Sequence, residues 1–151
     1  MLYLVDTGVL LRAVDRKSPD HAAIMAAFRE FRRRQDRLSA SAQSIREFWN
    51  VSTRPTTARG DYGRSIERTI HWVSSFERIL RILPETPATY ARWRDIVEQY
   101  KVIGLQVHDA NLVAVADIYG AGAVVTLNPS DFARFSTVQV LTPEQVVASG
   151  P

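Results

Sequence analysis

The sequence contains no cysteine and only three histidines among its 151 residues. The lack of cysteine excludes a disulfide framework, a thiolate metal site and catalysis by a cysteine nucleophile. No apolar run approaches the roughly 20 residues that a membrane-spanning helix requires. The apolar N-terminal stretch is interrupted by Asp6 and has no basic segment before it, so it does not resemble a signal peptide. We therefore expect a protein without a membrane segment, for which the cytoplasm is the simplest location.

Lysine is also nearly absent. It occurs only at Lys17 and Lys101, so arginine supplies most of the 19 basic residues, which outnumber the 16 acidic residues. Arginine suits bidentate contact with phosphate groups, but it also serves as ordinary solvated surface. The charge alone therefore does not identify a protein that binds nucleic acid.

The composition, with 46% hydrophobic and 23% charged residues, is typical of one soluble globular domain. We find no repeat, low-complexity tract or linker, so residues 1–151 are interpreted as a single domain. Strand-like runs alternate with helix-like segments, which predicts an α/β fold whose mostly parallel, five-stranded sheet is covered on both faces. The expected strands are 2–6, 37–41, 78–83, 122–126 and 138–141. The expected helices are about 19–34, 42–53, 66–77, 87–100 and 109–119, with a last short helix starting at 142–144.

Asp6 follows the apolar run Leu2–Val5, which predicts a short buried strand. The carboxyl end of a parallel strand is where open α/β sheets place their ligand chemistry. An isolated carboxylate is costly to bury there unless it is paired or bound to a cation. After Asp6, residues 6–8 are expected to turn the chain into a second apolar segment, 9–11.

Glu47 allows two interpretations. The pair Ser44 and Glu47 has the spacing of a capping box, which would make Glu47 part of a helix start. Ser41 is the better start, because the preceding strand ends there and Ala42 and Gln43 are compatible with a helix. Glu47 would then lie in the second turn, where it can point at the carboxyl edge of the sheet.

Two further acidic positions stand beside strands or buried helices. Asp109 precedes a nearly apolar helix, where it could serve as the N-cap, as a site residue, or as both. Asp131 lies in the turn Asn128–Asp131 after a strand, where local hydrogen bonding to the backbone is the simpler explanation.

The joint placement of these residues is more informative than any one of them. In a parallel sheet, Asp6, Glu47, Asp109 and the Asn128–Asp131 turn converge on one edge. Two carboxylates about 4 Å apart repel by roughly 4 kcal/mol at an effective dielectric constant near 20, so several together demand a proton or a divalent cation. Oxygen ligands without cysteine or clustered histidine favour Mg²⁺ or Mn²⁺ over zinc.

The chain resembles the PIN-domain ribonucleases, and among them the VapC-type toxins of bacterial toxin–antitoxin pairs. The resemblance covers essentially the whole length. It rests on four motifs in order, which are Leu4-Val5-Asp6-Thr7, Arg46-Glu47-Phe48, Val107-His108-Asp109-Ala110 and Thr126-Leu127-Asn128-Pro129-Ser130-Asp131-Phe132. It implies a three-layer α/β/α fold and an acidic pocket that binds Mg²⁺ or Mn²⁺ and cleaves RNA. It also implies a homodimer held inactive by a cognate VapB-like antitoxin.

By the same resemblance, Asp6, Glu47 and Asp109 match the first three acidic residues of the family, and Asn128 or Asp131 matches the fourth. Catalysis and metal binding are accordingly expected at Asp6, Glu47, Asp109 and Asp131. The hydroxyls of Thr7 and Thr126 are possible auxiliary groups, as is Asn128. The family often has Asn or Ser two residues after the first Asp, where this chain has Gly8.

Other side chains extend this hypothesis. Arg46, Arg54 and Arg59 border the loop after the Glu47 helix and are expected to position RNA phosphates near the acidic pocket. Aromatic residues at helical spacing, Tyr90 and Trp93 among them, are interpreted as core or as the lining of a groove for an antitoxin helix.

Two other functions compete with this one. A phosphohydrolase of the haloacid-dehalogenase type also has an Asp after its first strand, but it needs a second Asp where this chain has Gly8. A PIN-like domain that has lost catalysis and serves as an interaction module is the non-enzymatic alternative. The presence of all four acidic residues argues against it.

Overall fold

The computed structural model describes residues 1–56 and 62–149, and in these residues five strands form one sheet in which every pair is parallel. The strand order is β3-β2-β1-β4-β5, so the first strand of the chain lies at the centre. The strands are β1 (Leu2–Val5), β2 (Arg37–Ser41), β3 (Arg81–Leu83), β4 (Ala123–Val125) and β5 (Val140–Leu141). The predicted five-stranded α/β fold is confirmed, and the carboxyl ends of all strands share one edge.

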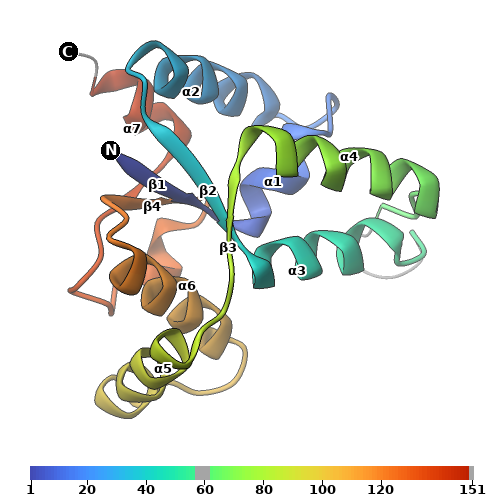
Figure 1. The fold of residues 1–151 in the computed structure, drawn as a ribbon. Coiled ribbons are helices and arrows are strands. Elements are labelled where there is room, and N and C mark those ends of the chain that lie inside the picture. The colour runs from blue at the N-terminus through green and yellow to red at the C-terminus, as the bar shows by residue number, and fades with distance from the viewer. Residues whose placement is uncertain (57–61, 150–151) are drawn as a thin grey trace.

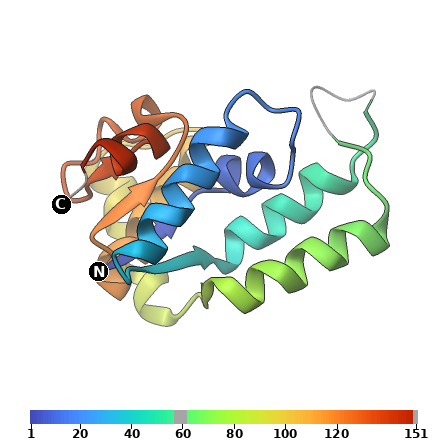
Figure 2. The same cartoon turned by 90° about the horizontal axis from the view of Figure 1, so that it is seen from above.

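Helices cover both faces of the sheet and make three layers (Figure 1). One face carries α5 (Pro87–Gln99) and α6 (Gln106–Tyr119), whose apolar side chains pack with Leu4 and Val124. The other face carries α1 (Thr7–Ala13), α2 (His21–Arg33), α3 (Ala42–Thr53), α4 (Ile66–Ile79) and α7 (Pro143–Ala148). Seen from above, α3 and α4 run side by side away from the sheet (Figure 2).

The central strand explains the unbroken apolar run near the N-terminus. Leu4 belongs to the cluster under α6, whereas Tyr3 and Val5 belong to the clusters on the opposite face. A strand that is buried on both faces needs apolar residues at every position rather than at alternate ones. Leu4 and Val5 are fully buried, so the chain direction at Asp6 is fixed by packing on both sides.

Several predicted boundaries are wrong for local physical reasons. Residues after Asp6 form α1 instead of a turn, because the Asp6 carboxylate accepts a hydrogen bond from the Thr7 N–H and so caps the helix. The expected strand 78–83 is only Arg81–Leu83, because the Leu80 N–H still closes the last turn of α4 on the Phe76 carbonyl. The helix expected at 19–34 starts at His21 after Asp20, and the strand expected at 138–141 is Val140–Leu141.

Ser41 caps α3, as predicted. Its extended backbone ends β2, and its Oγ accepts a hydrogen bond of 2.9 Å from the Ser44 N–H. The capping box between Ser44 and Glu47 is therefore excluded. Glu47 lies in the second turn of α3, one turn after Gln43. Within residues 1–56 and 62–149, no helix combines the length and apolar character needed to cross a bilayer.

Candidate active site

Asp6 stands at the carboxyl edge of the sheet, between the ends of the neighbouring strands β1 and β4. Both of its carboxylate oxygens are held by hydrogen bonds. The Thr7 N–H donates to Oδ1 at 2.6 Å, and the Thr126 hydroxyl donates to Oδ2 at 2.8 Å. Because Thr126 directly follows β4, the parallel pairing of β1 with β4 brings the two residues together.

Glu47 is held by two side chains from different helices. The Thr7 hydroxyl donates to Glu47 Oε2 at 2.8 Å, and the Gln43 amide donates to Oε1 at 2.5 Å. Gln43 Oε1 in turn accepts a hydrogen bond of 2.5 Å from the Asn111 amide. This series of contacts connects α1, α3 and α6 and fixes the direction in which the Glu47 carboxylate points.

Gln43 and Asn111 were not expected from the sequence. A signal was present, because Gln43 precedes Glu47 by one helical turn and Asn111 follows Asp109 by two residues. The sequence did not show that these two side-chain amides, 68 positions apart in the chain, form a hydrogen bond with each other.

Asp109 lies in the first turn of α6, and not at the N-cap, because the helix begins three residues earlier at Gln106. A helix N-terminus favours the ionised form of an acid. The pKa of Asp109 is nevertheless raised to about 6, because burial and the neighbouring charges outweigh the effect of the helix. These charges belong to Asp6, Asp131 and Glu47. The nearby His108 opposes this shift.

The pKa of Asp6 is also raised, chiefly by burial. The hydrogen bonds from Thr126 and Thr7 oppose that shift, and the charges of Glu47 and Asp131 add to it. Asp131 is itself exposed, in the short 3₁₀ helix η1 (Pro129–Phe132). The structure thus brings Glu47 and Asp131 within electrostatic range of both Asp6 and Asp109, at the edge where the sequence predicted that they would meet.

The two candidates for the fourth position, Asn128 and Asp131, approach the site in different ways. Asn128 contacts the site through its backbone N–H, which donates to the Thr126 hydroxyl at 3.1 Å. Its side chain does not cap η1. Asp131 instead contributes a charge that raises the pKa of both Asp6 and Asp109.

The chemistry of these residues suits a hard divalent cation. No three Asp, Glu or His side chains in the described parts of the chain form a ready-made metal cage. Mg²⁺ does not need one, because it usually binds one or two carboxylates and keeps several waters. The donors here are oxygen atoms, and the pKa values of Asp6 and Asp109 are raised first by burial and then by the charges of their acidic neighbours.

Gly8, the departure from the usual family motif, leaves Asp6 intact. A Cβ atom built on Gly8 would lie 3.9 Å from Asp6 Oδ2, which is ordinary van der Waals contact. The position is therefore wide enough for a side chain, and such a side chain would reach the Asp6 carboxylate. With glycine there, Asp6 keeps its two hydrogen bonds from Thr7 and Thr126.

The predicted basic residues have different surroundings. Arg46 is exposed on α3 beside Glu47, and its guanidinium binds Glu85 at 2.8 Å. Arg54 is the C-cap residue of α3. Arg59 lies outside the described residues. The His108 ring is 3.9 Å from Glu47 Oε1, beyond hydrogen-bond distance.

A comparison of the whole sequence with protein-family models identifies the family. Residues 3–137 match the family model of the PIN domain, and the chain belongs to that family. The match runs from Tyr3 in β1 to beyond η1, and therefore includes all four acidic residues. No curated protein matches the sequence.

Solved structures share this fold along nearly the entire chain. DNA-bound VapBC from Salmonella typhimurium has a TM-score of 0.72 at 18% identity, with 95% of this chain and 99% of that chain covered. VapBC2 from Rickettsia felis, bound to a promoter DNA fragment, has a TM-score of 0.68 at 17% identity, with coverage of 94% and 98%. VapC20 from Mycobacterium tuberculosis, a sarcin-ricin loop cleaving toxin, has a TM-score of 0.62 at 14% identity, with coverage of 88% and 95%.

The raised pKa of Asp109 predicts how stability depends on pH when no metal is bound. The ordinary carboxyl pKa is 3.8 and the folded-state pKa is about 6, so the folded protein binds more protons between these values. Stability from this group is then fully present below about pH 4 and is lost as the pH rises through about 6. Thermal unfolding in EDTA should show this decline, and Asp109→Asn should reduce it and be more stable than the wild type at pH 7. An identical pH profile for the two proteins would contradict the assignment.

Proposed function

We propose that this protein is a metal-dependent endoribonuclease and the toxin of a VapBC-type toxin–antitoxin pair. The observation that supports this most is the convergence of Asp6, Glu47, Asp109 and Asp131 at the carboxyl edge of β1 and β4. Membership of the PIN domain family and the likeness to solved VapBC assemblies add to it.

The reaction is hydrolysis of an RNA phosphodiester bond. The oxygen of a water molecule bonds to phosphorus, the bond from phosphorus to one ribose oxygen breaks, and that oxygen takes up a proton. A Mg²⁺ or Mn²⁺ ion bound here would activate water and offset the charge that develops on the phosphate. Asp6 and Asp109 would hold the ion directly, while Glu47 and Asp131 would orient its waters.

The residues around the acids support this division of roles. Thr126 and Thr7 fix both oxygens of Asp6, so that carboxylate presents a constant geometry. Gln43 and Thr7 do the same for Glu47. Ligands whose orientation is fixed by such hydrogen bonds bind metal more tightly, since less ordering is left to the binding step.

Basic side chains near the acids would position the RNA backbone. Arg46 is the best placed in the described residues, because it is exposed beside Glu47 on the same helix. Arg54 and Arg59 are proposed for the same role. Arginine binds phosphate through two parallel hydrogen bonds. This geometry fixes the position of the RNA strand and also adds to the binding energy.

The proposal extends to partners. We infer a cytoplasmic homodimer that is held inactive by a VapB-like antitoxin. The solved Salmonella, Rickettsia and FitAB structures are complexes bound to DNA. A short gene directly upstream that encodes a DNA-binding N-terminal segment would support the toxin role, and co-purification of its product with this protein would test it.

Neutralising either central acid should abolish cleavage while the fold survives. Asp6→Asn and Asp109→Asn should each lower the rate of RNA cleavage in Mn²⁺ by at least about 100-fold, because each removes a charge that holds the ion. The matched control is Asp95→Asn, which changes an exposed acid on α5. Full activity of both site variants would exclude this assignment. A wild-type protein that binds RNA without cleaving it would favour the interaction module instead.

Arg46→Gln should weaken RNA binding only by removing a contact with the phosphate backbone of the RNA. Loss of one phosphate contact is expected to reduce the slope of log affinity against log salt by about 0.7 on single-stranded RNA, measured by anisotropy in EDTA. Arg33→Gln is a suitable control, because Arg33 is also exposed and paired with a glutamate but lies on α2. An unchanged slope for Arg46→Gln would remove Arg46 from the RNA site.

A further inference from the structure

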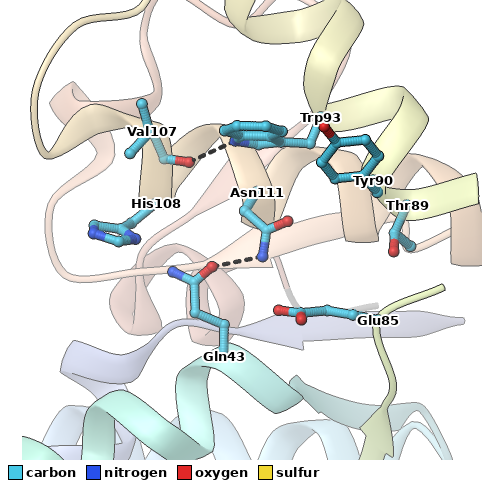
Figure 3. Close-up of a pocket in the computed structure, with 8 residues that line it drawn as sticks. All are labelled: Gln43, Glu85, Thr89, Tyr90, Trp93, Val107, His108 and Asn111. Atoms are coloured by element: carbon cyan, nitrogen blue, oxygen red, sulfur yellow. Dashed lines mark hydrogen bonds between the residues drawn. The ribbon is translucent and has the colours of Figure 1, made fainter. Parts of the chain in front are cut away.

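A groove of about 240 Å³ lies next to the acidic site, between α3, α5 and α6 (Figure 3). This volume lies just below the usual range of ligand pockets and suits a single small ring system. Two aromatic residues of α5, Tyr90 and Trp93, line one side of it, and Gln43 and Asn111 line another. The sequence predicts these aromatic residues as core or as the lining of a groove for an antitoxin helix. Tyr90 is in fact 64% exposed.

On the aromatic side of the groove, Trp93 is held by a hydrogen bond and is partly buried, whereas Tyr90 beside it is open to solvent. The Trp93 indole N–H donates to the Val107 carbonyl at 3.0 Å, which ties the ring to the start of α6. The Tyr90 and Trp93 rings are 5.8 Å apart between centroids and tilted by 36°. Exposed aromatic rings held in place are the platforms on which single-stranded nucleic acids stack their bases.

The polar side of the groove carries hydrogen-bond acceptors. Asn111 donates through its amide nitrogen to Gln43, and its carbonyl oxygen points away from Gln43 toward the side where Tyr90 and Glu85 lie (Figure 3). The Glu85 carboxylate lines the same groove and binds Arg46 through Oε1. Two acceptors facing an aromatic platform match a base that carries an exocyclic amino group, since such a base offers N–H donors at its edge.

The groove is directly coupled to the acidic residues. Gln43 donates to Glu47 with its nitrogen and accepts from Asn111 with its oxygen, so one side chain separates the groove from the Glu47 carboxylate. A base in the groove would therefore place the phosphate of its own nucleotide, one ribose away, toward the acidic site. This short connection also means that the bound base and the orientation of Glu47 depend on the same amide.

We propose that this groove holds the base next to the scissile phosphate and prefers a base with an exocyclic amino group over uracil. The proposal rests on the proposed ribonuclease function and specifies the substrate for it. Trp93 and Tyr90 stack on the base, and Asn111 and Glu85 accept hydrogen bonds from its amino edge. Asn111 is thus a specificity-determining residue.

Trp93 provides a direct readout of base stacking. The chain has three tryptophans, and the double variant Trp49→Phe/Trp72→Phe leaves Trp93 as the sole one. In EDTA, hexa-adenylate should quench its fluorescence more strongly and at lower concentration than hexa-uridylate. Tyr90→Ala in this background should weaken hexa-adenylate binding by about 5- to 140-fold, the loss expected for one base stack.

Asn111→Ala should bring the affinities for hexa-adenylate and hexa-uridylate closer together. The control Gln99→Ala changes an exposed amide at the end of α5 and should leave the ratio of the two affinities unchanged.

The base groove would be overturned, and the ribonuclease function left standing, by either of two results. One is RNA binding, measured by anisotropy, without quenching of Trp93 fluorescence. The other is an unchanged affinity ratio in Asn111→Ala. Neither binding nor cleavage by the wild type would overturn both. Tyr90→Ala could instead convert a dimer to a monomer without changing the ratio of the hexa-adenylate and hexa-uridylate affinities. That result would show that the groove is an interface between copies, and it would overturn the proposal.

Discussion

The repulsion among carboxylates at one edge of a parallel sheet is the constraint on which the rest of this site depends. Asp6 is positioned by a strand that is buried on both faces, so it cannot move away from its neighbours without disturbing the core. Burial and like charges raise the pKa of Asp6 and Asp109. A divalent cation bound here would relieve this repulsion by supplying the opposite charge, and its binding would then be coupled to the stability of the sheet edge.

The surrounding hydrogen bonds fix the orientations of the Asp6 and Glu47 carboxylates. Thr7 is central, because its N–H binds Asp6 and its hydroxyl binds Glu47. One residue at the start of α1 therefore aligns acids from two distant parts of the chain. Gln43 continues the network from Glu47 to Asn111 and so to the aromatic groove. The acidic site and the groove are positioned by the same side chains, which is why we assign them to the same substrate.

Much of the fold was predictable because local signals agreed with the global pattern. Ser41 marks the end of β2 and the start of α3, and its cap geometry matches the prediction. The short helix α1 was missed because the sequence pattern alone suggested a turn at residues 6–8, whereas the Asp6 carboxylate caps a helix there. The pairing of Gln43 with Asn111 and the exposure of Tyr90 depend on how α3, α5 and α6 pack, which no local pattern encodes.

The central claim is that Asp6 and Asp109 together hold a divalent cation. The most direct test is anomalous diffraction from crystals soaked in Mn²⁺, since it locates the ion without relying on activity. We expect one strong peak at about 2.1 Å from a carboxylate oxygen of each of these two residues. A well-ordered site without such a peak, or a peak held only by residues elsewhere, would contradict it.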